Sequence, residues 1–143
     1  MPDTSAERFQ LDARLAEDSH WIADGPLSQL RLMDDTRFPW LVLVPRLPGA
    51  VEWVDLPADQ QALLWDEVRQ ACALLRADGR CDKLNIGALG NMVRQLHVHV
   101  VARVEGDAAW PGAAWGSGAA VRHEPEQLQS RLAALRAAWP GPG

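Results

Sequence analysis

Two histidines stand two positions apart in the otherwise largely apolar stretch RQLHVHVVAR, residues 94–103. Successive side chains of a β-strand point to opposite faces. A strand here would place an ordinary apolar set on one face: Leu96, Val98 and Val100. The other face would carry polar and cationic groups: Gln95, His97, His99 and Arg103. Two neighbouring imidazoles can bracket one phosphate, because one ring nitrogen can attack phosphorus while the other ring hydrogen-bonds an oxygen.

Two other interpretations of the pair remain open on these residues alone. His97 and His99 could supply two metal ligands, but further ligands would have to come from elsewhere in the chain. His20 and His123 are available, yet neither stands at a spacing typical of a metal site. The polar face could also be a solvated one on which histidines are tolerated. We expect no metal, and the spacing alone does not separate phosphate chemistry from a solvated face.

The segment before the histidines favours the phosphate interpretation. The sequence NIGALGN, residues 85–91, indicates a short strand that breaks into a turn containing Gly90. Such turns expose backbone N–H groups, which bind anions. Asn85 and Asn91 add neutral amide donors close to the histidines, and these can orient a phosphate group.

With these features in order, residues 28–103 resemble the histidine-triad (HIT) superfamily of nucleotide hydrolases and transferases. The family pattern is N-x-G, a glycine-rich turn, and Q-[S/T]-V-x-H-x-H-x-H followed by two apolar residues. The residues that match it as they stand are Asn85, Gly87, Gly90, Val93, His97, His99, Val100 and Val101. The segment LVLVPR, residues 41–46, fits the family strand that ends in proline and a basic residue, here Arg46.

The resemblance implies nucleophilic catalysis at an α-phosphate. His97 falls on the family's nucleophile and would form a nucleotidyl-histidine, which water or another acceptor then cleaves. His99 would donate to a phosphate oxygen, and Asn85, Gly90 and Asn91 would hold the phosphate. The implied substrate is a nucleoside phosphoramidate, an adenylylated amine or a dinucleoside polyphosphate, with no cofactor. HIT-like proteins are commonly dimers, so we expect a homodimer.

The chain departs from the family pattern at several positions. Gln95 replaces the first triad histidine; it keeps hydrogen-bonding groups but cannot titrate, and we expect it to orient the site. Asn91 stands where the family has glutamine, and Met92 stands where it has serine or threonine. Pro48 and Trp40 occupy positions where many members carry histidine. Because Met92 lacks a hydroxyl, a catalytically weak nucleotide-binding module is a second hypothesis, and a metal-binding or structural protein is a third.

Three further features are candidates for contacts with the nucleotide. Asp34 ends the strand that flanks the nucleoside in the family and could bind ribose hydroxyls, although aspartate is also a common turn residue. Arg46 is a candidate phosphate contact. The loop DAAWPGAAWGSGAA, residues 107–120, could use Trp110 or Trp115 to cover the nucleotide, to reach a partner subunit or simply to pack.

The elements that must position these residues follow from the hydrophobic pattern. Residues 5–18 could form a short helix, and strands are predicted over 27–35, 37–46 and 94–103. Residues 83–91 are predicted as a further strand that breaks into the glycine turn. A helix is predicted over 58–78 with Gly79 as its C-terminal cap, and a last helix over 124–139. Residues 140–143 are expected to fray. This order predicts a single α+β domain over residues 1–143, with an antiparallel sheet of about five strands and both longer helices packed on one side.

Composition places the chain among ordinary globular proteins. It has 143 residues, of which 48% are hydrophobic and 23% charged. The net charge of −5 argues against a nucleic-acid partner, and no apolar run approaches the roughly 18 residues of a membrane span. The first residues lack the basic start and apolar block of a secretory signal, so the expected location is the cytoplasm. Cys72 and Cys81 have neither zinc-site spacing nor disulfide density.

Overall fold

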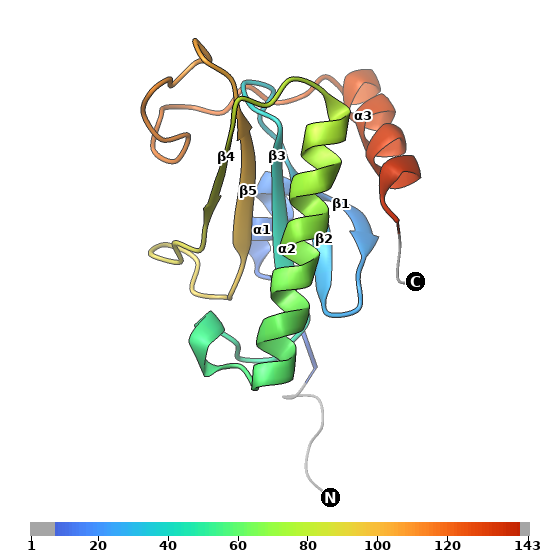
Figure 1. Ribbon diagram of the computed structural model, residues 1–143, viewed down its shortest axis with the longest axis vertical. Coiled ribbons are helices and arrows are strands. Elements are labelled where there is room, and N and C mark those ends of the chain that lie inside the picture. Colours follow the sequence, from blue (N-terminus) through green and yellow to red (C-terminus); the bar gives the residue numbers. More distant parts are fainter. Residues whose placement is uncertain (1–7, 141–143) are drawn as a thin grey trace, which may run out of the picture.

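The computed structural model describes residues 8–140, which form a five-stranded sheet with helices on both faces (Figure 1). In chain order the elements are α1 (Ala13–Asp18), β1 (Ser19–Asp24), β2 (Ser28–Met33), β3 (Trp40–Pro45), α2 (Ala58–Asp78), β4 (Lys83–Gly87), β5 (Val98–Arg103) and α3 (Pro125–Ala138). A short 3₁₀ helix, Trp53–Asp55, precedes α2. Residues 5–7 of the expected first helix and residues 141–143 of the expected frayed tail lie outside the described residues.

The sheet is antiparallel throughout, with the strand order β1-β2-β3-β5-β4. Hairpins join β1 to β2, β2 to β3 and β4 to β5. The strands β3 and β5 lie side by side although α2 and β4 separate them in sequence. This arrangement confirms the predicted α+β class and the antiparallel sheet. Strand β5, which carries His99, lies next to the edge strand β4.

The two faces of the sheet pack against different parts of the chain. The helices α2 and α3 cover one face, where the central strands contribute buried apolar side chains: Leu30, Leu32, Leu41, Leu43, Val98 and Val100. A second cluster covers the opposite face and joins α1 and the loop after β5 to the sheet: Leu15, Phe38, Trp40, Val42, Val101 and Ala114. The predicted apolar face of the histidine strand is therefore confirmed. The short helix α1 lies on the other face from α2 and α3 (Figure 1).

The hydrophobic pattern of the sequence did not predict the first strand of the sheet. Strand β1 was not predicted, because its sequence SHWIAD does not alternate; a register shift between Trp21 and Ala23 leaves every third residue buried. The first helix begins only at Ala13. Strand β4 ends at Gly87, and the predicted glycine turn follows it at residues 88–91. Helix α2 has the predicted bounds, and Gly79 caps it with an extended backbone, φ 171°, rather than a left-handed one.

A buried carboxylate ties α2 to the hairpin between β1 and β2. Glu67 is 1% exposed, and its Oε2 accepts hydrogen bonds from the backbone N–H groups of Leu27 at 3.0 Å and Ser28 at 3.1 Å. Gly25 lies against the same oxygen, since a Cβ atom built there would stand 2.2 Å from Glu67 Oε2. The hairpin thus needs a residue without a side chain at this position.

We expect Gly25→Ala to lower the free energy of unfolding by about 1–3 kcal/mol, because the added methyl must displace a buried, hydrogen-bonded carboxylate. Gly79→Ala is the matched control. Nothing lies within 4 Å of a Cβ at Gly79, so that variant should lose no stability. Urea unfolding of both variants measures the difference, and equal stabilities would contradict the packing described for Glu67.

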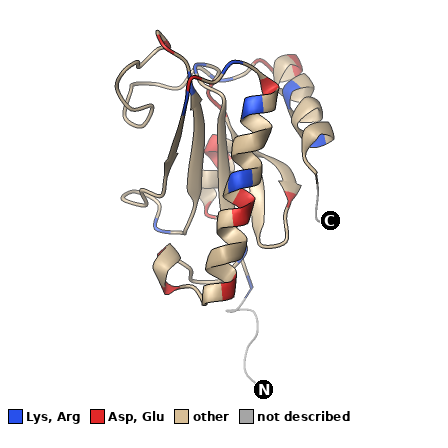
Figure 2. Ribbon diagram, in the orientation of Figure 1, with Lys and Arg blue, Asp and Glu red and all other residues tan. Residues whose placement is uncertain are grey.

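Acidic and basic residues are interspersed along α2 (Figure 2). Within the described residues, no helix has the length and apolar character needed to cross a membrane.

Candidate active site

His97 and His99 lie side by side on the face that α2 and α3 leave open. Strand β5 begins only at Val98, so His97 directly precedes the strand that was predicted to include it. Each is 6% exposed, and their ring centroids are 4.9 Å apart with the planes inclined at 71°. The register of β5 with β3 places Val42 opposite His99 and Trp40 opposite Val101, so the tryptophan shares the histidine face. The geometry expected from the alternation of the strand is present.

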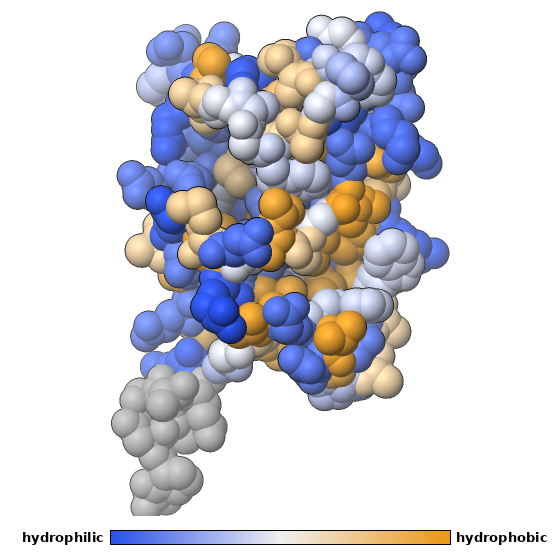
Figure 3. Space-filling view, turned by 90° about the vertical axis from the view of Figure 1, so that its left-hand side faces the viewer, coloured by the Kyte–Doolittle hydropathy of each residue, from blue (hydrophilic) through white to orange (hydrophobic). Residues whose placement is uncertain are grey.

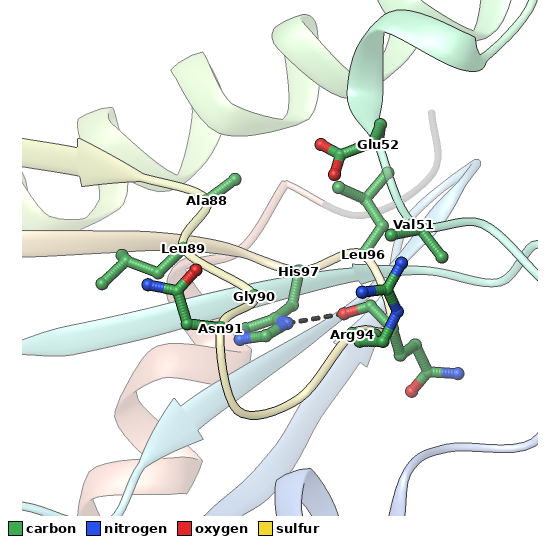
Figure 4. A pocket seen from close by; sticks show the side chains of 10 residues that line it. Val51, Glu52, Ala88, Leu89, Gly90, Asn91, Arg94, Leu96 and His97 are labelled. Carbon is green, nitrogen blue, oxygen red and sulfur yellow. Dashed lines mark hydrogen bonds between the residues drawn. The ribbon is translucent and has the colours of Figure 1, made fainter.

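Hydrogen bonding fixes which nitrogen of His97 is free. Its Nδ1 lies 2.7 Å from the backbone carbonyl oxygen of Gln95. A carbonyl oxygen only accepts, so Nδ1 carries the proton and donates it. In the neutral ring the lone pair therefore lies on Nε2, which is the nucleophilic form of an imidazole. Figure 4 shows this contact, with the second ring nitrogen of His97 on the side of the turn that carries Asn91.

The opposite arrangement holds at His99. Its Nδ1 accepts a hydrogen bond of 3.0 Å from the indole Nε1–H of Trp40, which can only donate. The proton of neutral His99 therefore lies on Nε2. Burial, with a smaller effect of the neighbouring His97, lowers the pKa of His99 to about 3. His99 is thus a neutral hydrogen-bond donor near pH 7, rather than a cation.

Gln95 acts on the site through its position in the chain. Its side chain donates from Nε2 to the carbonyl of Gln10 at 2.8 Å and accepts from the backbone N–H of Asp12 at 2.8 Å. The amide thereby holds the segment before α1 against the start of β5. Its backbone carbonyl, in turn, orients His97.

A cavity of about 720 Å³ opens beside the two histidines. Its walls come from α1, the end of β2, the turn at residues 89–93 and the loop at 114–120; the apolar part is formed by Leu15, Met33, Trp40, Leu89, Val93 and Trp115. The ring of Trp115 is centred 5.6 Å from that of His99. A Cβ at Gly87 would stand 3.3 Å from the same indole, so glycine leaves room for Trp115, whose ring is inclined at 76° to that of His99.

Asp34 lies on the wall of this cavity, but its carboxylate is already fully engaged. Its Oδ1 accepts from the backbone N–H of His123 at 2.8 Å and lies 2.7 Å from Nδ1 of His123; its Oδ2 lies 3.0 Å from His20 Nε2 and 3.3 Å from Arg122 Nη1. Burial raises the pKa of Asp34, but these hydrogen bonds outweigh it and hold the pKa well below its ordinary value. Asp34 therefore joins β1, β2 and the segment before α3, and ribose binding by its carboxylate stays a prediction.

Of the four remaining residues predicted to contact phosphate, two line the cavity and two do not. Gly90 and Asn91 line the cavity, and Gly90 has the left-handed backbone, φ 70°, that its turn requires. Asn85 does not line it; its Oδ1 accepts from Arg103 Nη1 at 3.0 Å. Arg46 donates to the carbonyl of Gly25 at 2.9 Å, in the β1–β2 hairpin, so its contact with phosphate stays a prediction.

Trp40 is the site residue whose role sequence reasoning missed. It was noticed only as a departure from the pattern, whereas its indole fixes the tautomer of His99. The alternation of β3 was the available signal, but using it required the register between β3 and β5. Among residues 8–140, no three His, Cys, Asp or Glu side chains are grouped so as to hold a metal ion.

Comparison with known proteins agrees with this arrangement. The HIT domain model matches residues 14–106, which is more than half of the chain. The chain belongs to the HIT family. The match begins in α1 and ends just after β5, and so includes both histidines and the turn before them. The suspected family is confirmed, and the chain is a HIT-type nucleotide-binding protein.

Solved structures of bacterial histidine triad proteins are similar over almost the whole length of this HIT protein. One from Bradyrhizobium japonicum is 46% identical with a TM-score of 0.88, and covers 92% of this chain and 98% of its own. One from Sinorhizobium meliloti is 45% identical with a TM-score of 0.87, over 91% and 96% of the two chains. One from Marinobacter aquaeolei is 41% identical with a TM-score of 0.86, over 92% and 96%. No curated protein matches the chain.

Proposed function

We propose that this HIT protein is a nucleotide hydrolase or transferase that cleaves at the α-phosphate through a nucleotidyl-histidine on His97. The observation that carries the proposal is the hydrogen bond from His97 Nδ1 to the Gln95 carbonyl, which leaves the Nε2 lone pair free beside the cavity. The substrate class is a nucleoside phosphoramidate or a dinucleoside polyphosphate. The HIT family, which generally comprises hydrolases and transferases, supports the reaction type.

The proposed reaction has two displacements at phosphorus. His97 Nε2 attacks the α-phosphate, the new N–P bond forms, and the bond to the leaving group breaks with the electron pair going to that group, which takes up a proton. Water then attacks the same phosphorus and loses a proton. The N–P bond breaks with its electron pair returning to His97 Nε2, which releases the nucleoside monophosphate and restores neutral His97 with its proton on Nδ1. If another acceptor attacks the nucleotidyl-histidine in place of water, the nucleotide is transferred to that acceptor instead of being hydrolysed.

The groups around His97 would stabilise the phosphate as its charge shifts. His99 donates through Nε2–H, and because its Nδ1 is held by Trp40 this donor does not depend on rotation or protonation. Gly90 and Asn91 contribute from the turn that borders the cavity. Asn85 does not line the cavity and its oxygen is bound by Arg103, so a contact between its Nδ2 and the phosphate stays a prediction. Gln95 orients His97 without reacting.

A turnover panel tests the proposal. The wild type should release AMP from adenosine phosphoramidate, diadenosine tetraphosphate or both, with each product followed by chromatography. Tight binding of AMP with no turnover of any member would favour the catalytically weak binding module instead. Equimolar bound zinc whose removal unfolds the protein would favour the metal-binding hypothesis.

We further propose a homodimer formed through the β4 edge. Strand β4 ends the sheet, so the outer backbone N–H and C=O groups of this strand face away from it. Beside it, α2 and β4 form a shallow apolar hollow lined by Trp65, Val68, Cys72, Ala73 and Ile86, together with Arg69, Arg76 and Ala77. Figure 3 looks at this side of the molecule and shows hydrophobic residues gathered across it. Trp65 is 53% exposed and Ile86 is 43% exposed.

We expect Trp65→Ala to raise the dimer dissociation constant by about 30-fold or more, the effect of removing a central aromatic contact. Trp21→Ala is the matched control, because Trp21 is 45% exposed on β1 at the opposite edge of the sheet. Sedimentation velocity over a range of concentrations measures both. A dimer weakened equally by the two substitutions, or by neither, would place the interface elsewhere.

A further inference from the structure

A second, smaller cavity adjoins the one that holds the histidine pair (Figure 4). Its volume is about 250 Å³. Four residues line both cavities: Leu89, Gly90, Asn91 and His97. His97 and the glycine turn therefore stand at the boundary, and a ligand whose α-phosphate lies at His97 can extend into both spaces.

The smaller cavity is bordered by Arg94, whose positive charge has no acidic partner within the described residues. Within residues 8–140, the Arg94 guanidinium has no hydrogen bond or ion pair. Two arginines of the larger cavity, by contrast, are held by acids: Arg37 by Asp35 and Arg122 by Asp34. In Figure 4 the side chain of Arg94 borders the small cavity close to Val51. Arg94 is exposed, so its guanidinium is available to a ligand that enters the small cavity beside His97.

The other polar groups of the cavity are mostly donors. Asn91 offers a side-chain amide. Within the described chain, the backbone N–H groups of the lining residues 89–91 and 94 make no hydrogen bond, whereas Leu96 N–H is paired with the carbonyl of Ala50. Glu52 is the single carboxylate among the lining residues, and it forms no ion pair with Arg94 within the described residues. A site with unpaired N–H groups and a free guanidinium suits an anion.

The size of the small cavity limits which part of a substrate it can hold. At about 250 Å³ it is smaller than the roughly 300–1,000 Å³ of pockets that enclose whole ligands. Its small size and its polar lining suit a phosphate group better than a nucleoside. The larger, more apolar cavity on the other side of His97 is the one that can take the nucleoside. What lies in the small cavity is therefore the part of the substrate beyond the α-phosphate.

We propose that the small cavity is a subsite for the leaving group, and that Arg94 selects substrates whose leaving group begins with a phosphate. This inference rests on the proposed function, in which that group departs from His97-bound phosphorus. It assigns the protein to nucleoside polyphosphates rather than to phosphoramidates of uncharged amines. Glu52 limits the number of negative charges that the subsite accepts.

Binding and turnover together test the subsite. Titration calorimetry with AMP and with ATP measures the ratio of the two affinities, and kcat/KM is compared for diadenosine tetraphosphate and adenosine phosphoramidate. Arg94→Gln should lower the ratio of ATP to AMP affinity about tenfold or more, since a charge-assisted hydrogen bond is lost. It should lower the kcat/KM ratio of the two substrates in the same direction. Arg94→Lys should recover part of both losses, and Glu52→Gln should raise ATP affinity.

Arg80→Gln is the charge-matched control, since Arg80 pairs with Asp82 and lines neither cavity at His97. Unchanged ratios in Arg94→Gln, or equal losses for AMP and ATP, would overturn the subsite, as would a wild type that binds neither nucleotide. If the affinity ratio shifts as expected while no variant turns over any substrate, the subsite stands and the proposed catalysis fails. If turnover depends on His97 but the ratios do not depend on Arg94, the catalysis stands and the subsite fails.

Discussion

His97→Ala is expected to lower kcat for AMP release by at least about 10⁴-fold, the order of effect seen when an enzyme loses its nucleophile. His99 cannot take over, because its Nδ1 accepts from Trp40 and its Nε2 carries the proton. The measurement is single-turnover release of AMP from whichever panel substrate the wild type cleaves.

Two controls separate lost chemistry from lost structure. His97→Asn retains an N–H donor that can reach the Gln95 carbonyl, and should fold normally while remaining inactive. His20→Asn alters a histidine whose Nε2 contacts Asp34 at 3.0 Å but which does not line the cavity, and should stay close to wild-type activity. A His97→Ala variant that turned over like the wild type would remove His97 from the mechanism.

Asp107→Ala is expected to lower the free energy of unfolding by about 3–5 kcal/mol, because it leaves a buried guanidinium without its partner. Arg103 is 2% exposed, and its Nε and Nη2 donate to the two oxygens of Asp107 at 2.8 Å each. The same arginine lies over the rings of Phe38 and Trp110 and holds Asn85. Losing the pair should therefore loosen the loop after β5 as well.

The pH dependence of stability gives the same pair a second test. Hydrogen bonds from Arg103, against a smaller opposing effect of burial, lower the pKa of Asp107 to about 2. A carboxyl with a pKa below its unfolded value of about 3.9 stabilises the fold above that value, and the contribution is lost as the pH falls towards 2. Asp107→Ala should flatten the stability profile in this window.

Asp66→Ala is the control for both measurements on this pair. Asp66 pairs with Arg69 on the surface of α2, and its side chain is 46% exposed. Solvent screens such pairs, so the variant should lose no more than about 1 kcal/mol. If Asp66→Ala and Asp107→Ala lowered the free energy of unfolding equally, the burial of Arg103 would not determine how much stability is lost.

Local patterns were enough to find the elements that carry the site. The three- to four-residue spacing of apolar side chains placed α2 with its observed bounds: Leu64, Val68, Cys72 and Leu75. Period-two alternation placed His97 and His99 on one face of β5, and the glycine turn followed from its composition. These features depend on neighbours within a few residues, which a sequence displays directly.

The parts that could not be foreseen depend on contacts between distant residues. The side chain of Gln95 bonds to Gln10 and Asp12, more than 80 positions away in the chain. Asp34 ended a predicted strand, but only the fold brings His20 and His123 onto its carboxylate. Strand β1 escaped notice because a bulge breaks its alternation. Composition and spacing carry no record of such pairings.

The proposed reaction depends on covalent attachment of the nucleotide to His97, and rapid quench detects this intermediate directly. The protein is mixed with a substrate from the panel that carries a labelled α-phosphate, quenched in base within the first turnover, digested and mapped. We expect acid-labile label on the peptide that contains His97, appearing before free AMP and absent from His97→Ala. AMP formed by the wild type with no label on His97 at any time before product would contradict it.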